Sequence, residues 1–224
     1  MMSNLFSIFD TSTSLMFNFN WFSSISNIIL LPLMFWFFPS KMFFFFNMIN
    51  MIMFNELKSI LLNKFNILNS IFFLSMFFMI LINNMMGLFP YIFTSSSHMI
   101  FSLSISLSMW LSLMIFMMLN NMNFMFSHMI PQSTPNILMP FMVLIETTSN
   151  IIRPSTLTIR LTANMIAGHL LLTLLSETAI NPNLIISYLI ILIQIMLLIL
   201  EFSVSIIQSY VFTILSTLYL KETN

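Results

Sequence analysis

The sequence alternates long apolar segments with short polar interruptions. A helix needs about 20 apolar residues to cross a hydrocarbon core that is about 30 Å thick. Residues 21–38, 67–93 and 98–120 have this character, and Pro32 in the first is tolerable because neighbouring helices can satisfy the carbonyl that a proline frees. The first half of the chain is therefore predicted to hold three membrane-spanning helices.

Two later apolar segments, residues 136–176 and 183–220, are much longer than an upright span requires. At about 1.5 Å per residue, the second segment measures roughly 57 Å as a single helix. To stay within a bilayer it must tilt steeply or bend. Because only the short polar stretch "ETAINPN" separates the two segments, they are predicted to form a long, steeply tilted hairpin.

Residues 41–66 interrupt the apolar pattern with lysine, glutamate and asparagine. Such a mixture is typical of a helix that lies in the membrane interface. Counting the spans puts Lys41, Lys58, Lys64 and Lys221 on one side of the membrane, as the positive-inside rule predicts. The N-terminus is expected to face the opposite compartment.

Composition supports a membrane protein and excludes several kinds of site. Only 5% of the 224 residues are charged, against about 25% in an ordinary soluble domain. The chain is therefore predicted to be a single all-α integral membrane domain over residues 1–224, with about five membrane helices and one interfacial amphipathic helix. The net charge is zero and there is no long basic run, which argues against nucleic-acid binding. The absence of cysteine excludes disulfides, thiolate metal sites and thiol nucleophiles. The two glycines cannot form a phosphate-binding loop, so no nucleotide site is expected on this chain. No metal site and no cofactor are expected.

The stretch "RLTANMIAGHLL" places Arg160 and His169 inside an apolar helix. A charge at mid-membrane costs about 2.5–3.5 kcal/mol on insertion scales, so Arg160 needs a partner or a role. At about 100° per residue, its helix face holds small or polar residues: Glu146, Arg153, Thr156, Ala163, Asn164 and Ala167. Such a face lets another helix approach closely. The alternative for Arg160 is a structural ion pair with Glu201 or Glu146, while Arg153 with Glu146 is interpreted as a local charge pair or a subunit contact.

A second polar stripe lies on the opposite side of this helix and comprises Thr162, His169, Thr173 and Ser176. In the last segment, Gln194, Glu201 and Gln208 are spaced by seven residues. Folding the hairpin brings Glu201 to the level of Arg160 through His169, and a histidine near a carboxylate in lipid is a candidate proton relay. The alternative for His169 is a hydrogen-bonded histidine between helices, and for the glutamines and serines a role in packing alone.

Three stretches carry a resemblance to a known family: "NNMMGLFPYIFT", "PQSTPNILMPFMVLIETTSNIIRPSTLTIRLTANMIAGHLL" and "LEFSVSIIQSYVFTILSTLYL". Almost continuously from Asn83 to Tyr219, the sequence resembles the mitochondrial a subunits of ATP synthase. The resemblance implies a proton-conducting stator subunit with two half-channels, which pass protons to and from carboxylates of the rotating c-ring. Proton flow would thereby be coupled to rotation and ATP synthesis. The excess of Phe, Met, Ile and Asn agrees with an organelle gene.

The resemblance also implies roles for individual residues. Arg160 is expected to be the essential charge that faces the c-ring, with Gln208 as its neighbour. His169 and Glu201 are expected on the proton path, and Glu146 on its matrix side. With the polar residues of the two stripes, the expected proton path comprises His169, Glu201, Gln208, Glu146, Asn164, Gln194, Ser176 and Thr173.

Partners and location follow from the same resemblance. The expected partners are the c-ring, the peripheral stalk, other small membrane subunits and the lipid bilayer, and the chain is not expected to be catalytic on its own. It is expected to be a multi-pass protein of the mitochondrial inner membrane, with its N-terminus in the intermembrane space and its C-terminus in the matrix. The alternative function is a secondary transporter or an antiporter-like respiratory subunit; transporters often have repeated halves, and the sequence shows no internal repeat. A purely structural anchor leaves the two polar stripes unexplained.

Overall fold

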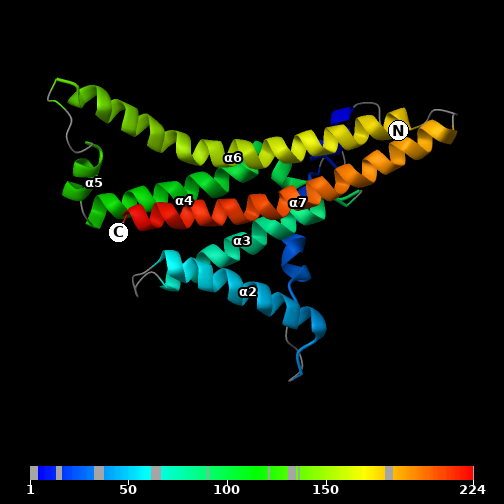
Figure 1. Cartoon of the computed structure of the whole chain (residues 1–224), viewed down its shortest axis with the longest axis horizontal. Helices are drawn as coiled ribbons and strands as arrows, with labels where there is room; N and C mark the ends of the chain where they lie inside the picture. The colour runs from blue at the N-terminus through cyan, green and yellow to red at the C-terminus, as the bar shows by residue number, and fades with distance from the viewer. Residues whose placement is uncertain are drawn as a thin grey trace.

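The computed structural model describes residues 5–13, 17–32, 38–61, 67–89, 91–120, 122–130, 135, 137–179 and 184–223. Within them, all regular structure is helical (Figure 1). Four of the described helices are long and apolar enough to cross a membrane: Leu68–Gly87, Met99–Asn120, Met139–Thr178 and Ile185–Glu222. The chain is an all-α integral membrane protein, which confirms the prediction from the apolar pattern.

The two C-terminal helices run the length of the molecule. Helices α6 (Met139–Thr178) and α7 (Leu184–Thr223) have 40 residues each, about 60 Å of helix and twice the thickness of a hydrocarbon core. They lie side by side toward the hairpin and diverge toward the other end, where α4 (Met99–Asn120) lies between them (Figure 1). Helix α6 is bowed and contains Pro154, which removes a backbone hydrogen bond of the helix. The hairpin turn at 180–183 lies outside the described residues.

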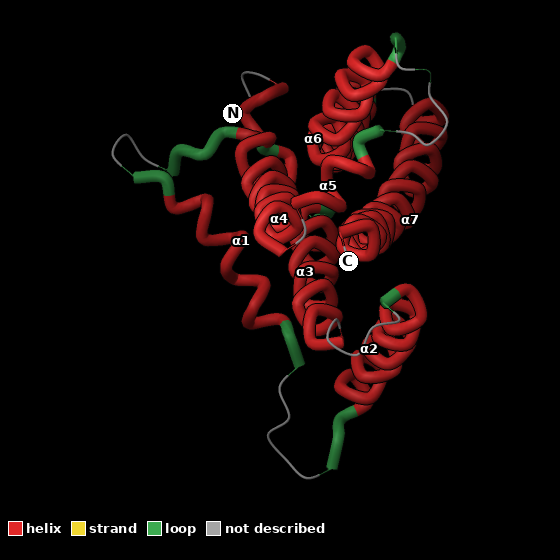
Figure 2. The backbone as a smooth tube through the Cα atoms, turned by 90° about the vertical axis from the view of Figure 1, so that its left-hand side faces the viewer, coloured by secondary structure: helices red, strands yellow, loops and turns green. Residues whose placement is uncertain are grey.

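Helix α3 (Ile67–Gly87) packs along α7 at the centre of the group of helices, as Figure 2 shows in a view along the long axis. The buried side of α7 is rich in small hydroxyl side chains: Ser205, Ser209, Thr213, Ser216 and Thr217. Each hydroxyl donates a hydrogen bond to a carbonyl of its own helix three residues earlier. Because these polar groups need no partner on another helix and are small, the neighbouring helices can approach closely.

Helix α2 (Lys41–Ile60) forms most of the predicted interfacial region; residues 62–66 lie outside the described residues. The Ser40 hydroxyl caps it by accepting a hydrogen bond from the Phe43 N–H at 3.3 Å. Phe46 packs on Phe78 of α3 with ring centroids 4.5 Å apart. Several large apolar side chains of α2 stay exposed: Met42, Phe44, Phe45, Met48, Met51 and Ile52. Its position in the membrane interface stays a prediction.

The first predicted span, residues 21–38, contains the short helix α1 (Phe22–Ser26) and the 3-10 helix η3 (Asn27–Leu30). Residues 33–37 lie outside the described part of the chain, so a continuous first membrane helix stays a prediction. Two further 3-10 helices, η1 (Leu5–Phe9) and η2 (Phe19–Trp21), precede α1.

The loop after α3 anchors the N-terminal part of the chain. Because α3 ends at Gly87, the last part of the predicted span 67–93 lies in this loop, which leads to the buried 3-10 helix η5 (Ser95–Ser97). The Ser23 hydroxyl donates a hydrogen bond to the Phe93 carbonyl of the loop at 3.1 Å. At the opposite end of the molecule, α4 is followed by the short helix α5 (Met122–His128).

Candidate functional site

The structure brings His169 of α6 and Glu201 of α7 to one cavity, as folding of the hairpin predicted. The cavity has a volume of about 270 Å³, and Asn164 and Gly168 also line it. Glu201 is only 8% exposed, and among the described residues neither of its carboxyl oxygens has a hydrogen-bond partner. A buried carboxyl group without partners is costly unless water or another group reaches it. The cavity supplies the space for such a group.

His169 also lines a second, larger cavity of about 730 Å³. The walls of this cavity come from Thr173 of α6, from the loop after α3 and from the N-terminal segment, including Asp10. The His169 imidazole lies near the backbone of Gly87, and its Nε2 has no hydrogen-bond partner among the described residues. The histidine therefore lies between a cavity that contains Glu201 and a cavity that contains Asp10.

Arg160 is exposed on α6. Among the described residues it has no hydrogen-bond or ion-pair partner, so the structure does not pair it with Glu201 or Glu146. Its neighbours on the same helix face, Ala163 and Ala167, are exposed as well. The face around Arg160 is thus free of bulky side chains from its own helix and open to another protein.

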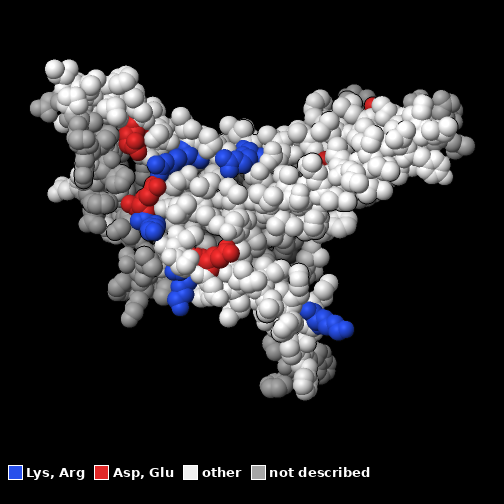
Figure 3. Space-filling model, viewed as in Figure 1, with Lys and Arg blue, Asp and Glu red and all other residues white. Residues whose placement is uncertain are grey.

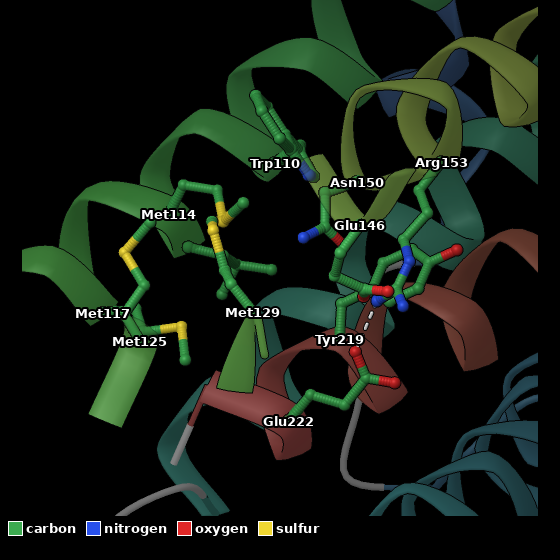
Figure 4. Close-up of a pocket in the computed structure, with 11 residues that line it drawn as sticks. Trp110, Met114, Met117, Met125, Met129, Glu146, Asn150, Arg153, Tyr219 and Glu222 are labelled. Carbon is green, nitrogen blue, oxygen red and sulfur yellow. Dashed lines mark hydrogen bonds and ion pairs between the residues drawn. The ribbon is translucent and has the colours of Figure 1, made fainter. Parts of the chain in front are cut away.

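A third cavity, of about 60 Å³, lies near the far end of α6 and contains Glu146. Methionine side chains of α4 and the α5 region form one side of it, and charged and aromatic groups of α6 and α7 form the other (Figure 4). There Arg153 forms an ion pair with Glu222, not with Glu146 as its position on α6 suggested. The Arg153 guanidinium also lies 5.2 Å from the centre of the Tyr219 ring.

Glu146, Arg160 and His169 follow one another along α6. At about 1.5 Å per residue, Glu146 is roughly 21 Å from Arg160, and His169 is roughly 14 Å from Arg160 in the opposite direction. Most of the charged groups visible on one face of the molecule lie toward α5 and the C-terminus, whereas the arm that ends in the hairpin is almost without them (Figure 3). Arg160 consequently lies between two cavities that are offset along the helix.

The remaining predicted path residues are distributed unevenly. Thr173 lies in the larger cavity with His169, and Asn164 in the cavity with Glu201. Gln194 and Gln208 are half-buried on α7 and line none of these three cavities, and neither does the exposed Ser176. The sequence spacing of these polar residues shows only which of them share a helix face. It could not predict which of them line a cavity.

Two acidic residues at these cavities were missed by the sequence reasoning. Asp10 lies in an irregular segment, where no helical period indicates a direction, and Glu222 lies in the last turn of α7. The only signal for either was the rarity of acidic residues, six in the chain. The rarity of acidic residues does not show which other residues Asp10 or Glu222 lies near.

The chain is closely similar to known proteins over its whole length. The model of the family described as ATP synthase A chain matches residues 15–221. ATP synthase subunit a of Locusta migratoria is 54% identical, with 99% of both chains covered. The proteins of the same name from Drosophila melanogaster and Anopheles quadrimaculatus are each 50% identical, with 100% of both chains covered. The chain therefore belongs to the ATP synthase subunit a family, the proton-translocating stator subunit of the membrane sector of ATP synthase.

Proposed function

We propose that the two cavity regions at the ends of α6 belong to two half-channels, and that protons pass from one to the other only on carboxylates of a rotating c-ring. The observation that carries this proposal is the position of Arg160, which is exposed and unpaired among the described residues, between cavities offset along the helix. A continuous channel would not need a charged residue between two cavities that are offset along the helix. Two offset half-channels need a carrier that moves between them.

On the hairpin side, His169 and Glu201 transfer the proton. An imidazole can accept a proton on one ring nitrogen and release one from the other, which suits a group between two cavities. Glu201 then receives the proton in the smaller cavity and delivers it toward the ring. Asn164 and Thr173 orient water in these cavities, and Ser176, Gln194 and Gln208 extend the polar surface of the path.

Arg160 keeps the two half-channels apart. A guanidinium retains its charge even in a low-dielectric site, so it repels a proton that would otherwise pass directly along α6. It attracts each ring carboxylate in its ionised form as the carboxylate passes, which favours release of the proton. The cost of placing Arg160 in the membrane, about 2.5–3.5 kcal/mol on insertion scales, is offset by this succession of partners. A fixed ion pair within the chain could not serve in this way.

On the other side, Glu146 accepts the proton that leaves the ring and passes it to the matrix. The supporting observation is that Glu146 lines a cavity at the end of α6 near the C-terminus. Lys58 and Lys221, in the last turns of α2 and α7, favour the matrix for this side by the positive-inside rule. The N-terminus then faces the intermembrane space, across the mitochondrial inner membrane.

The partners in this proposal are the c-ring at the Arg160 face, and the peripheral stalk and other small membrane subunits on the remaining surface. The many large apolar side chains exposed on the chain support extensive contacts with lipid and other membrane subunits.

The test replaces Arg160 with alanine in the assembled ATP synthase. ATP synthesis driven by an imposed proton gradient, and passive proton leak, are measured in vesicles and normalised to assembled complex. We expect Arg160→Ala to abolish coupled synthesis without preventing assembly. Lys58→Ala, which removes an exposed cation on α2, is the matched control and should leave synthesis unchanged. Near-normal coupled synthesis in Arg160→Ala would refute the proposal.

A further inference from the structure

We propose that the N-terminal segment, residues 5–13 and 17–21, forms the outer wall of the half-channel on the His169 side, and that the Asp10 carboxylate collects protons there for transfer to His169. The inference rests on the proposed function and adds an entry residue that lies outside the long helices. The juxtaposition that carries it is the shared cavity of about 730 Å³, which Asp10 and His169 both line.

The cavity is suitable for water. A water molecule occupies about 30 Å³ in the liquid and needs two to four polar partners in a protein. The walls offer such partners at both ends: Asp10, Ser12 and Asn20 on the N-terminal segment, and His169 and Thr173 on α6. A connected group of waters therefore has space and hydrogen-bonding groups between the carboxylate and the imidazole.

The N-terminal segment is held in place at several points. The Phe9 ring contacts the His169 ring edge-on, with centroids 6.2 Å apart. The Asn20 side chain donates a hydrogen bond to the Asp10 carbonyl at 3.0 Å. Trp21 packs on Phe93 of the loop after α3, with ring centroids 5.8 Å apart. These contacts fix Asp10 relative to α6, so that its position at the cavity is part of the fold.

The Asp10 carboxylate is exposed and ionised at neutral pH. Its Oδ1 accepts a hydrogen bond from the Ser12 backbone N–H at 3.2 Å, and this bond holds the pKa of Asp10 below its ordinary value of 3.8. An exposed anion attracts hydronium and exchanges protons with bulk water. The transfer balances simply: hydronium protonates the carboxylate, the carboxylic acid returns the proton to cavity water, and that water protonates His169.

Glu177 provides a matched comparison. It is also acidic and exposed, and it lies near the same end of α6, about 12 Å beyond His169 by helical rise. It does not line the cavity that Asp10 and His169 share. If any negative charge at this end of the molecule sufficed, Glu177 would matter as much as Asp10.

The first experiment measures ATP synthesis driven by an imposed proton gradient in vesicles, normalised to assembled complex. We expect Asp10→Asn to lower the rate several-fold, Asp10→Glu to restore most of it, and Glu177→Gln to have no effect. The rescue separates proton collection from a structural role, because glutamate supplies a carboxylate but not the geometry of aspartate. A wild-type rate in Asp10→Asn, or equal losses in Asp10→Asn and Asp10→Glu, would overturn the inference.

A second experiment uses the absence of cysteine from this chain. In Ser12→Cys, a membrane-impermeant maleimide applied from the N-terminal side should label the cavity wall and slow proton flux several-fold. Labelling from that side without any loss of flux, or labelling only from the opposite side, would contradict the proposed wall. The proposed function itself has a different test: coupled ATP synthesis that persists in Arg160→Ala would refute it. Normal flux in Asp10→Asn alongside lost coupling in Arg160→Ala would remove only the entry residue.

Discussion

The Glu201 carboxyl group lies directly against Gly168, so close that a β-carbon at position 168 would stand 2.5 Å from Glu201 Oε1 and 2.7 Å from the carboxyl carbon. Gly168 precedes His169 in the chain, so the missing side chain makes room for Glu201 at the cavity that His169 also lines. Close approach of the α6 backbone to this carboxyl group is the reason for a glycine at position 168 in a helix that disfavours it.

Replacing Gly168 with alanine should therefore displace Glu201 and slow proton flux strongly. Forcing an extra carbon into a packed site costs about 1–3 kcal/mol, so the complex should still assemble. Shortening the neighbour by one methylene, in Gly168→Ala with Glu201→Asp, should recover part of the flux. Proton pumping driven by ATP hydrolysis measures both variants, and a double variant no better than Gly168→Ala alone would show that the two positions are not coupled in this way.

Removing the titratable group of His169 or Glu201 should slow proton transfer while leaving assembly largely intact. We expect His169→Ala and Glu201→Gln each to lower ATP-driven proton pumping, because both line the cavity next to Gly168. Ser176 is exposed and lines none of the cavities described above, so Ser176→Ala should lower proton pumping less than these two variants do. If pumping were unchanged in both His169→Ala and Glu201→Gln, these residues would not lie on the path.

A lysine at position 160 should not substitute for the arginine. Both side chains carry a positive charge, but an ammonium is more strongly hydrated and loses its proton more easily in a low-dielectric site. Arg160→Lys is therefore expected to assemble and to be severely impaired in coupled ATP synthesis, with a raised passive leak. Full activity in this variant would indicate that charge alone suffices and that the site is well hydrated.

The Arg153 site should contribute to stability more through its ring contact than through its ion pair. The side chains of Arg153 and Glu222 are 32% and 49% exposed, and exposed pairs of this kind stabilise by less than about 1 kcal/mol. The guanidinium also lies over Tyr219, a contact worth about 0.5–2 kcal/mol. Arg153→Ala should thus lower the thermal midpoint of the complex more than Glu222→Gln does.

Tyr219 provides the control for this comparison. Tyr219→Phe keeps the ring and should retain the midpoint, whereas Tyr219→Leu should lower it. An equal effect of Arg153→Ala and Glu222→Gln, with no effect of Tyr219→Leu, would assign the stabilisation to the ion pair.

The sequence by itself was sufficient to predict the four long apolar helices and the meeting of His169 with Glu201. In a bilayer each backbone polar group must be satisfied within its own helix, so long apolar segments have little structural choice. A short connection between two such helices then sets which residues reach the same level. His169 and Glu201 reach the same level of the hairpin, and both line one cavity.

Tertiary structure decided the partners of the charged groups. Arg153 and Glu146 share a helix face, but seven residues correspond to about 10 Å of rise, too far for a direct ion pair. The end of α7 instead brings Glu222 to Arg153. Asp10 reaches the cavity of His169 through an irregular segment held by Phe9, Asn20 and Trp21. Such a segment has no period from which a direction can be derived, and only the packing of distant parts of the chain determines where its carboxylate lies.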